Sequence, residues 1–212
     1  MSLPRLLLAD DHRIVVEGLR SILAPEFELV GIVEDGRELV EAATRLAPDV
    51  IVADISIPHL NGLDAVAKLK DLECTAKVVF LTMHKDATYA ARALALGASG
   101  FVLKHSASTD LLEAIREALL GRVYVTREIA AGLQKSTLTR TMSMSAPSLT
   151  PRQREVLQLF AEGHSARKVA AILHISPRTA ENHKARIMSQ LNLDTTCDLV
   201  QYALRHGIIA AE

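Results

Sequence analysis

The stretch LLLADDHRIVVEGL, residues 6–19, begins as a run of strand-forming apolar residues that ends in two adjacent carboxylates, Asp10 and Asp11. Residues with helical spacing follow the acids at once. A strand that is apolar on both faces and leads directly into an amphipathic helix is typical of a parallel sheet covered by helices. Because two like charges repel each other, an acid pair at the end of an apolar strand calls for an explanation.

The same alternation of strand and helix patterns continues through the first 120 residues. Strand-like runs cover 5–10, 27–33, 49–54, 77–82 and 100–104, and helix-like segments cover 13–24, 36–46, 62–70, 86–96 and 108–120. Five such units predict an α/β doubly wound domain with a five-stranded parallel sheet of the flavodoxin-like kind, in the strand order 2-1-3-4-5. We place this domain at residues 1–122.

The second half of the chain has a different pattern. The segment QKSTLTRTMSMSAPS, residues 134–148, has no apolar period, and we predict a partly helical linker at 123–147. Beyond it the pattern is helical only, with candidate helices at 151–162, 165–173, 177–191 and 195–206. Because such short helices are not stable alone, we predict that residues 148–212 pack into one small all-α domain.

Charge and composition also separate the two halves. Residues 1–128 carry 14 basic and 19 acidic side chains, whereas residues 148–212 carry 8 and 6, which favours two domains with different partners. Cys74 and Cys197 lie far apart and fit neither a disulfide framework nor a zinc site. The sequence has no apolar stretch of membrane-spanning length and no signal pattern, so we expect a cytoplasmic protein that makes no membrane contact.

Polar side chains stand at the ends of four predicted strands. Asp10 and Asp11 follow the first strand, Asp54 the third, Thr82 the fourth and Lys104 the fifth. In open parallel sheets, ligand sites form outside the carboxyl ends of the strands where the winding direction reverses, so we expect these side chains to meet there. Taken singly, a strand-end Asp is usually a helix cap or a turn residue. Their joint occurrence indicates a site.

The chemistry of that site follows from the side chains. Clustered carboxylates cannot all ionise at low cost, so they favour a bound cation. Oxygen ligands with no His or Cys cluster beside them favour Mg²⁺ over zinc. A carboxylate can also act as a nucleophile and form an acyl phosphate. In that case Lys104 would neutralise the phosphoryl oxygens, and Thr82 would donate a hydroxyl hydrogen bond.

The segments LADDH, DVIVADISIPHLNGLDAV, VVFLTMH and GASGFVLK resemble the receiver domain of bacterial two-component response regulators, over about residues 5–122. The resemblance implies that Asp54 is the phosphoacceptor and that Thr82 and Lys104 contact the phosphoryl group. It also implies a set of Mg²⁺ ligands: Asp10, Asp11, Asp54 and the backbone carbonyl of Ser56. Pro58 and Gly62 match the loop pattern after the phosphoacceptor.

Two further residues of this half carry hypotheses. Phe101 stands where the family has its aromatic switch, which would rotate inward on phosphorylation, and plain core packing is the alternative. Met83 follows Thr82 where many receivers have a small residue. We hypothesise that Met83 screens the acyl phosphate from water and slows its loss.

The segment SARKVAAILHISPRTAENHKARIMSQL, residues 165–191, predicts a helix, a tight turn and a second helix. Ser176 is a good N-cap, and Pro177 then falls at the first helical position. At 100° per residue, Ala180, Ile187 and Leu191 lie within about 20° of one line, which predicts the buried face. The opposite face has no acid at its centre and suits a DNA major groove, with an ordinary solvated face as the alternative. It carries Arg178, Asn182, Ala185, Arg186 and Ser189.

Residues 149–210 resemble the LuxR/GerE-type helix-turn-helix domain, and the chain as a whole is similar to NarL/FixJ-type response regulators. The resemblance implies that helix 177–191 enters the major groove. The DNA contacts we predict are Arg178, Thr179, Asn182, Lys184 and Arg186. Lys184 projects nearer the buried side, so phosphate suits it better than a base edge. Two residues depart from the family pattern, Gln153 in place of Glu and Ala180 in place of Val.

The resemblance also implies dimerisation through the final helix. Leu199, Val200 and Ala203 form part of an apolar stripe there, and packing on the bundle is the alternative role for that stripe. A dimer would present two recognition helices to DNA half-sites about 34 Å apart.

We therefore expect a phosphorylation-regulated, DNA-binding transcriptional response regulator. A sensor histidine kinase would transfer phosphate to Asp54 with Mg²⁺ bound, switching dimerisation and binding to double-stranded DNA. We expect a homodimer in the phosphorylated state, with RNA polymerase as a further candidate partner. The protein would accept phosphate on itself and would not be a turnover enzyme. The family suggests that the unphosphorylated receiver covers the recognition helix and that phosphorylation releases it or promotes dimerisation, and the sequence does not decide which.

Two alternatives from other classes stay open. The acid site could belong to a phosphatase or phosphotransferase that releases its product, which would need a general acid or base beside the nucleophile. Residues 55 and 56, Ile and Ser, offer none, and we expect His12 to point into the following helix. The receiver could instead serve only as a protein-interaction module of a DNA-binding protein. Failure of phosphotransfer while DNA binding persisted would favour that alternative.

Overall fold

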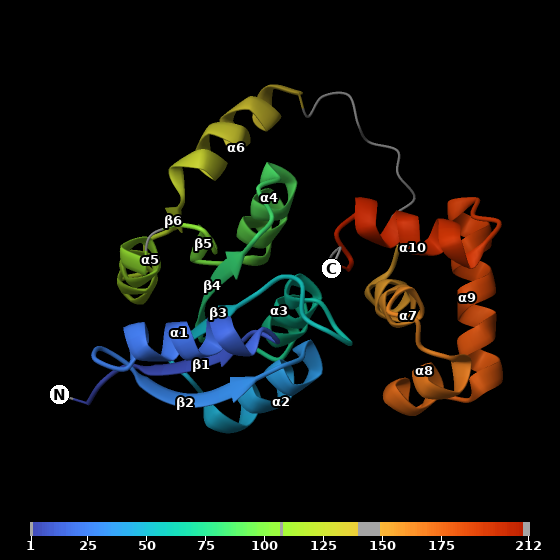
Figure 1. The fold of residues 1–212 in the computed structure, drawn as a ribbon, viewed down its shortest axis with the longest axis horizontal. Helices are drawn as coiled ribbons and strands as arrows, with labels where there is room; N and C mark the ends of the chain where they lie inside the picture. The colour runs from blue at the N-terminus through green and yellow to red at the C-terminus, as the bar shows by residue number, and fades with distance from the viewer. Residues whose placement is uncertain (1, 107, 140–148, 210–212) are drawn as a thin grey trace.

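The structure is a computed structural model that describes residues 2–106, 108–139 and 149–209. It contains an α/β domain followed by a small helical domain (Figure 1). The α/β domain has a parallel sheet in the order β2-β1-β3-β4-β5-β6, so the winding reverses between β1 and β3 as predicted. The strands are β1 (Arg5–Ala9), β2 (Glu28–Val33), β3 (Val50–Ala53), β4 (Lys77–Thr82), β5 (Gly100–Leu103) and β6 (Tyr124–Val125).

The number of strands is a correction, because the sheet has six strands where we predicted five. β6 pairs in parallel with β5, Tyr124 opposite Gly100 and Val125 opposite Phe101. Two residues are too few to show the alternation that identifies a strand in a sequence. After β6, α6 (Arg127–Thr139) packs beside α4. The predicted linker, 123–147, therefore begins with elements that belong to the receiver, and its residues 140–147 lie outside the described ones.

Helices cover both faces of the sheet, which explains why the central strands are apolar on both sides. One buried cluster joins α1 (Arg13–Leu23) and α5 (Ser108–Leu119) to the sheet. The other joins α2 (Gly36–Leu46), α3 (Gly62–Asp71) and α4 (Ala87–Leu96) to the opposite face. All four residues of β3 are fully buried between these layers.

The helical domain contains α7 (Pro151–Ala161), α8 (Ala166–Leu173), α9 (Pro177–Leu191) and α10 (Thr196–Arg205). Ser176 caps α9 by accepting from the Thr179 amide, and Pro177 is the first helical residue, as predicted. Gln153 completes a capping box with Thr150, so the amide does the work of the usual Glu at this position. Ala180 and Ile187 are fully buried, which confirms the predicted inner face of α9.

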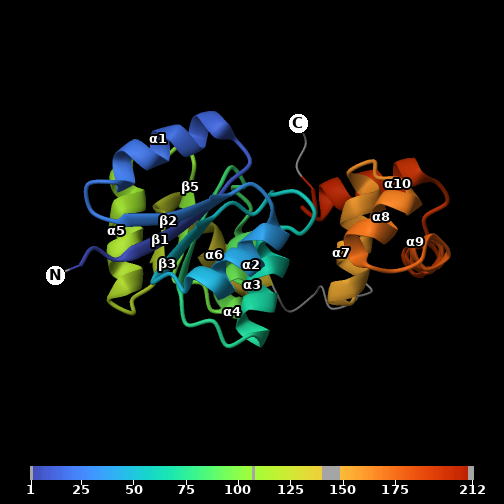
Figure 2. The ribbon, with the colours of Figure 1, turned by 90° about the horizontal axis from the view of Figure 1, so that it is seen from below.

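The helical domain docks on the receiver through α7. Figures 1 and 2 both show α7 and the C-terminal end of α10 on the side that faces the receiver, and α9 on the far side of the domain. Within the described part of the chain, no helix is both long and apolar enough to cross a membrane.

Candidate phosphoacceptor site and DNA-binding face

The carboxyl ends of β1, β3 and β5 bring two acids and a lysine together. Asp10 and Asp54 are 1% and 4% exposed, and the Lys104 ammonium lies 2.7 Å from Asp10 Oδ2 and 2.8 Å from Asp54 Oδ2. Burial alone would lower the pKa of Lys104, but the charges and hydrogen bonds of Asp54 and Asp10 outweigh burial and raise it. Lys104 is therefore a fixed positive charge next to the expected phosphoacceptor.

The loop after β3 holds Asp54 in place. Asp54 Oδ1 accepts the backbone amides of Ile55 at 2.6 Å and Ser56 at 3.3 Å. The amide of Gly62 donates to the Ile55 carbonyl at 2.8 Å, which closes the loop onto the first turn of α3. A Cβ on Gly62 would lie 2.2 Å from the Asp54 carbonyl oxygen, so only glycine allows this approach.

Asp11 and His12 complete the acidic side of the site. Asp11 is half-buried, and burial raises the pKa of its carboxyl. The Nδ1 atom of His12 lies 3.0 Å from Asp11 Oδ1 and 3.2 Å from Asp10 Oδ1. This corrects our expectation that His12 points into the next helix and that no His lies beside the acids. The ring turns back because Asp10 Oδ1 also accepts the His12 amide at 2.9 Å, which folds this residue over the carboxylates.

The donor set fits a divalent cation. One ligand atom each from Asp10, Asp11, His12 and Asp54 lie within 4.8 Å of one another, the only such group among the described residues. Asp10 Oδ2 contacts the Lys104 ammonium and Asp11 Oδ1 contacts the His12 ring, and a carboxylate oxygen with one such partner still has a lone pair for a ligand. Three carboxylates suit Mg²⁺, and His12, whose side chain is 61% exposed, adds a nitrogen at the rim.

Thr82 and Ser56 approach the site from β4 and from the loop after β3. Thr82 is fully buried, and its hydroxyl accepts the His84 amide at 3.2 Å. The Ser56 hydroxyl lies 2.7 Å from His84 Nε2, and the His84 ring stacks on Tyr89 at 4.6 Å between ring centroids. Burial lowers the pKa of His84, although the charge of Asp54 acts against this shift. The sequence contained His84, but no pattern singled it out.

Phe101 and Met83 carry two predictions about phosphorylation that one conformation does not test. Phe101 is fully buried in the receiver core, so an inward rotation has no exposed starting position here and the core-packing alternative describes the observed ring. Met83 is 64% exposed, so it gives the site little cover in this conformation. Its effect on the lifetime of an acyl phosphate stays a prediction.

The outer face of α9 is open to solvent. Arg178, Asn182 and Arg186 are exposed and Thr179 is half-buried, as a face that enters a groove requires. Lys184 is different, because its ammonium lies 4.9 Å from the Phe160 ring centroid and donates to the Thr196 hydroxyl at 3.1 Å. It must leave those contacts to reach DNA.

The predicted dimerisation stripe of α10 is used inside the domain. Leu199 and Ala203 are fully buried in the helical core, and Val200 packs against it. The packing alternative therefore describes these residues. The side of α10 that remains exposed carries Cys197, Gln201 and Leu204.

Comparison with known proteins agrees with both domains. Residues 6–116 match the response regulator receiver domain, and residues 147–203 match the luxR family of bacterial regulatory proteins. The transcriptional regulatory protein MctR of Rhizobium johnstonii is 31% identical over 97% of this chain and 95% of its own length. The response regulator UvrY of Escherichia coli is 30% identical over 97% of this chain and 96% of its own.

Solved structures give the same result for the whole chain. The RcsB response regulator of Salmonella typhimurium has a TM-score of 0.66 and 27% identity, covering 99% of this chain and 100% of its own. RcsB in a complex with DNA has a TM-score of 0.59 and 28% identity, covering 95% and 98% of the two chains. The receiver match alone spans more than half of the 212 residues, and the relatives match end to end. The chain therefore belongs to the two-component transcriptional response regulators that join a receiver domain to a DNA-binding helix-turn-helix domain of the luxR family.

Proposed function

We propose that Asp54 accepts a phosphoryl group from a sensor histidine kinase and that this modification controls dimerisation and DNA binding. The observation that carries the proposal is the contact of the buried Lys104 ammonium with both Asp54 and Asp10 at hydrogen-bonding distance. A buried carboxylate with a purely structural role would need only one cation, paired with it alone, to balance its charge. Here the lysine stands beside a group of carboxylates, from Asp10, Asp11 and Asp54, that can also hold a cation.

The residues divide the work of phosphoryl transfer. An oxygen of Asp54 forms a bond to phosphorus while the bond between phosphorus and the kinase histidine nitrogen breaks. Asp10, Asp11, Asp54 and the Ser56 carbonyl would hold Mg²⁺, which would neutralise negative charge on the phosphoryl oxygens. Lys104 follows the negative charge from the carboxylate to the phosphoryl group, and the Thr82 hydroxyl donates to a phosphoryl oxygen. The step needs no general base, because a carboxylate nucleophile has no proton to lose when it attacks.

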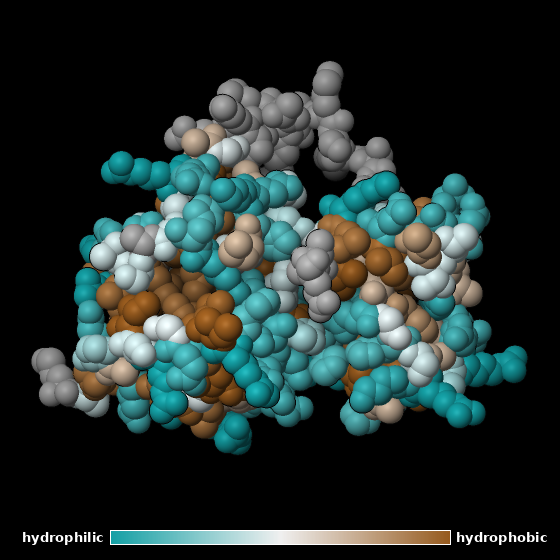
Figure 3. All heavy atoms as spheres, in the orientation of Figure 1, coloured by the Kyte–Doolittle hydropathy of each residue, from teal (hydrophilic) through white to brown (hydrophobic). Residues whose placement is uncertain are grey.

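The kinase has a surface to dock on beside this site. Ile14 on α1 is 90% exposed, and a groove between α1 and α5 runs to Lys104. Figure 3 shows the apolar side chains gathered over this part of the receiver. A helix of the kinase would place its apolar side in such a groove, next to the phosphoacceptor.

The output of the protein is binding of double-stranded DNA by α9, with RNA polymerase as a further partner. In the phosphorylated homodimer, the two copies of α9 bind two DNA half-sites. RcsB, of similar fold, is known in complex with DNA and as dimers on DNA. We place the protein in the cytoplasm, where the kinase and the DNA are both accessible. It consumes one phosphoryl group per molecule and does not turn over a substrate as an enzyme does.

The test is phosphorylation by acetyl phosphate with Mg²⁺, followed by intact mass measurement. Wild type should gain one phosphoryl group, and Asp54→Asn should gain none. Asp71→Asn, which removes an exposed acid of α3, is the matched control and should label as wild type does. Equal labelling of Asp54→Asn would refute the assignment. Turnover of a phosphate ester would favour a phosphatase, and DNA binding that persists without any labelling would favour a receiver used only as an interaction module.

A further inference from the structure

The receiver and the helical domain meet at the loop that follows the phosphoacceptor. Gln158 of α7 donates to the Ile57 carbonyl at 3.1 Å and accepts the Asn61 amide at 2.8 Å. The Glu162 carboxylate accepts the His59 amide at 3.1 Å. His59 has a φ of 63°, in the left-handed region that favours glycine. The helical domain thus satisfies the polar backbone of a strained loop that starts three residues after Asp54.

This contact leaves the recognition helix free. The exposed side chains of α9 have no contact with the receiver among the hydrogen bonds and ion pairs of the described residues, and α9 lies on the far side of its domain (Figure 2). Covering of α9 is therefore not how this docked arrangement would control the protein. The control must act on docking itself.

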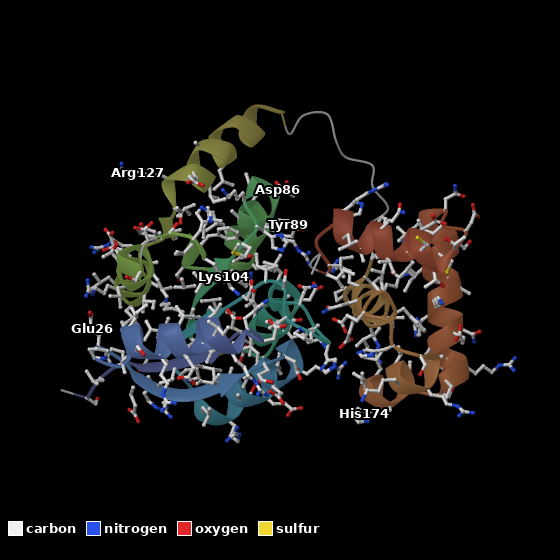
Figure 4. All side chains as sticks on the ribbon, in the orientation of Figure 1. Glu26, Asp86, Tyr89, Lys104, Arg127 and His174 are labelled. Carbon is white, nitrogen blue, oxygen red and sulfur yellow. The ribbon has the colours of Figure 1, made fainter. Side chains whose placement is uncertain are left out.

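A second contact joins the receiver to the end of α10. Gly207, which follows α10, is buried and has a φ of 54°. Tyr89 lies directly against Gly207, so a Cβ at this position would overlap with the Tyr89 hydroxyl and ring. Tyr89 projects from α4 towards the helical domain (Figure 4). The ring therefore fills the place where any other residue at position 207 would put its side chain.

Tyr89 is also connected to the phosphoacceptor loop. Its other neighbour is the His84 ring, which stacks on it and whose Nε2 bonds to the Ser56 hydroxyl at 2.7 Å. Ser56 lies two residues after Asp54, and its amide donates to the Asp54 carboxylate. A continuous series of contacts thus runs from the carboxylate through Ser56, His84 and Tyr89 to Gly207.

We propose that Tyr89 is the positioning residue that couples the state of Asp54 to docking of the helix-turn-helix domain. Building on the proposed function, a phosphoryl group on Asp54 draws the loop amides away and moves Ser56. His84 then loses its hydroxyl partner, the stacked pair shifts, and the Tyr89 ring no longer fits against Gly207. Because a close-packed contact accommodates little displacement, a small movement of the ring releases the domain.

The experiment measures docking directly in the full chain. A dye pair is placed on Cys197, which is exposed on α10, and on an introduced cysteine at the exposed Ser21 of α1, with Cys74→Ser. Wild type should show high energy transfer that falls after treatment with acetyl phosphate and Mg²⁺. The undocked fraction of Gly207→Ala should be at least tenfold higher without any phosphodonor, and the added Tyr89→Ala should return most of the transfer.

Backbone strain has its own control. Gly163 also has a positive φ, 83°, but a Cβ there would meet nothing within 4 Å. Gly163→Ala should therefore keep high transfer. If it undocks as far as Gly207→Ala, or if Tyr89→Ala gives no rescue, the contact between Tyr89 and Gly207 does not determine docking and the proposal is wrong.

The coupling step is tested with His84→Ala, measured together with phosphoryl incorporation. His84→Ala that carries a phosphoryl group on Asp54 should stay docked, because the ring stack that links the loop to Tyr89 is gone. If phosphorylated His84→Ala undocks as wild type does, the proposed coupling is wrong and the proposed function is unaffected. If wild type takes up no phosphoryl group on Asp54, the proposed function is wrong instead.

Discussion

The Glu155 carboxylate offers the sharpest test of what holds the two domains together. It lies on α7, is 2% exposed and contacts Arg37 and Lys68 of the receiver as well as Arg152 of its own helix. The variant Glu155→Gln keeps the shape of the side chain and removes the charge. The three cations then face a neutral amide in place of the buried carboxylate.

The magnitude follows from which contacts cross the interface. The Lys68 and Arg152 side chains are 40% exposed, so their pairs resemble surface ion pairs of under about 1 kcal/mol. Arg37 is 26% exposed, and its hydrogen bond to a buried carboxylate belongs to the stronger class of about 1.5–3 kcal/mol. Only Arg37 and Lys68 are lost on undocking, so we expect docking to weaken by about 2 kcal/mol. This is a rise of roughly 30-fold in the ratio of undocked to docked protein.

The assay is the energy transfer between the dyes on α1 and α10 described above. Glu181→Gln is the matched control, because it removes the same charge from an exposed site on α9. It should leave the docked fraction unchanged. A change of less than threefold in Glu155→Gln, or an equal change in Glu181→Gln, would refute the assignment of Glu155 as the main ionic contact of the interface.

Three further predictions follow from the same geometry. Burial alone would raise the pKa of Glu155, but Arg152, Lys68 and Arg37 lower it below its usual 4.5. Docking should therefore be complete above pH 4.5 and weaken as the pH falls through the lower pKa of the docked state. Energy transfer measured against pH checks this in a Glu162→Gln background, which removes a second acid whose pKa is raised by burial. Gly62→Ala should destabilise the receiver by about 1–3 kcal/mol in urea unfolding, because its Cβ would meet the Asp54 carbonyl. Gly18→Ala, in open space on α1, should instead stabilise the receiver by about 0.5–1 kcal/mol. Equal effects of the two variants would contradict the close approach of α3 to the Asp54 backbone. Arg186→Ala should lower DNA affinity and reduce by about one the slope of log affinity against log salt concentration, whereas Lys184→Ala should mainly lower the stability of the helical domain. Anisotropy titrations at several salt concentrations distinguish the two variants, and an unchanged slope in Arg186→Ala would exclude a phosphate contact.

The carboxylate site could be predicted from the sequence because its position depends on local patterns. The run LLLADD ends a buried strand at Asp10, VIVAD ends another at Asp54, and the carboxyl ends of parallel strands meet at one edge of the sheet. Any side chain at the end of such a run reaches the site. The same logic found the buried face of α9, since Ala180 and Ile187 recur at the helical period.

Other functional residues could not be found this way, because their roles depend on contacts between distant segments. Glu155 and Gln158 are polar residues on a helix that otherwise looks like an ordinary amphipathic one, and their burial arises only because a second domain covers them. His84 and Tyr89 follow a strand and begin a helix, positions where polar residues are common. Their importance comes from the stack between them and from Gly207, which is 118 residues further along the chain than Tyr89.

The exposure of α9 in the docked protein constrains how phosphorylation can control DNA binding. If docking covered the recognition helix, a single half-site would be bound more tightly after phosphorylation. Here Arg178, Asn182 and Arg186 are already exposed, so affinity for a half-site should change little. What undocking changes is the surroundings of α10, whose C-terminal turn is held against Tyr89. Phosphorylation should therefore raise affinity chiefly for paired half-sites about 34 Å apart, where two copies bind together. An equal gain on single and paired half-sites in fluorescence anisotropy would show that the recognition helix is covered in solution after all.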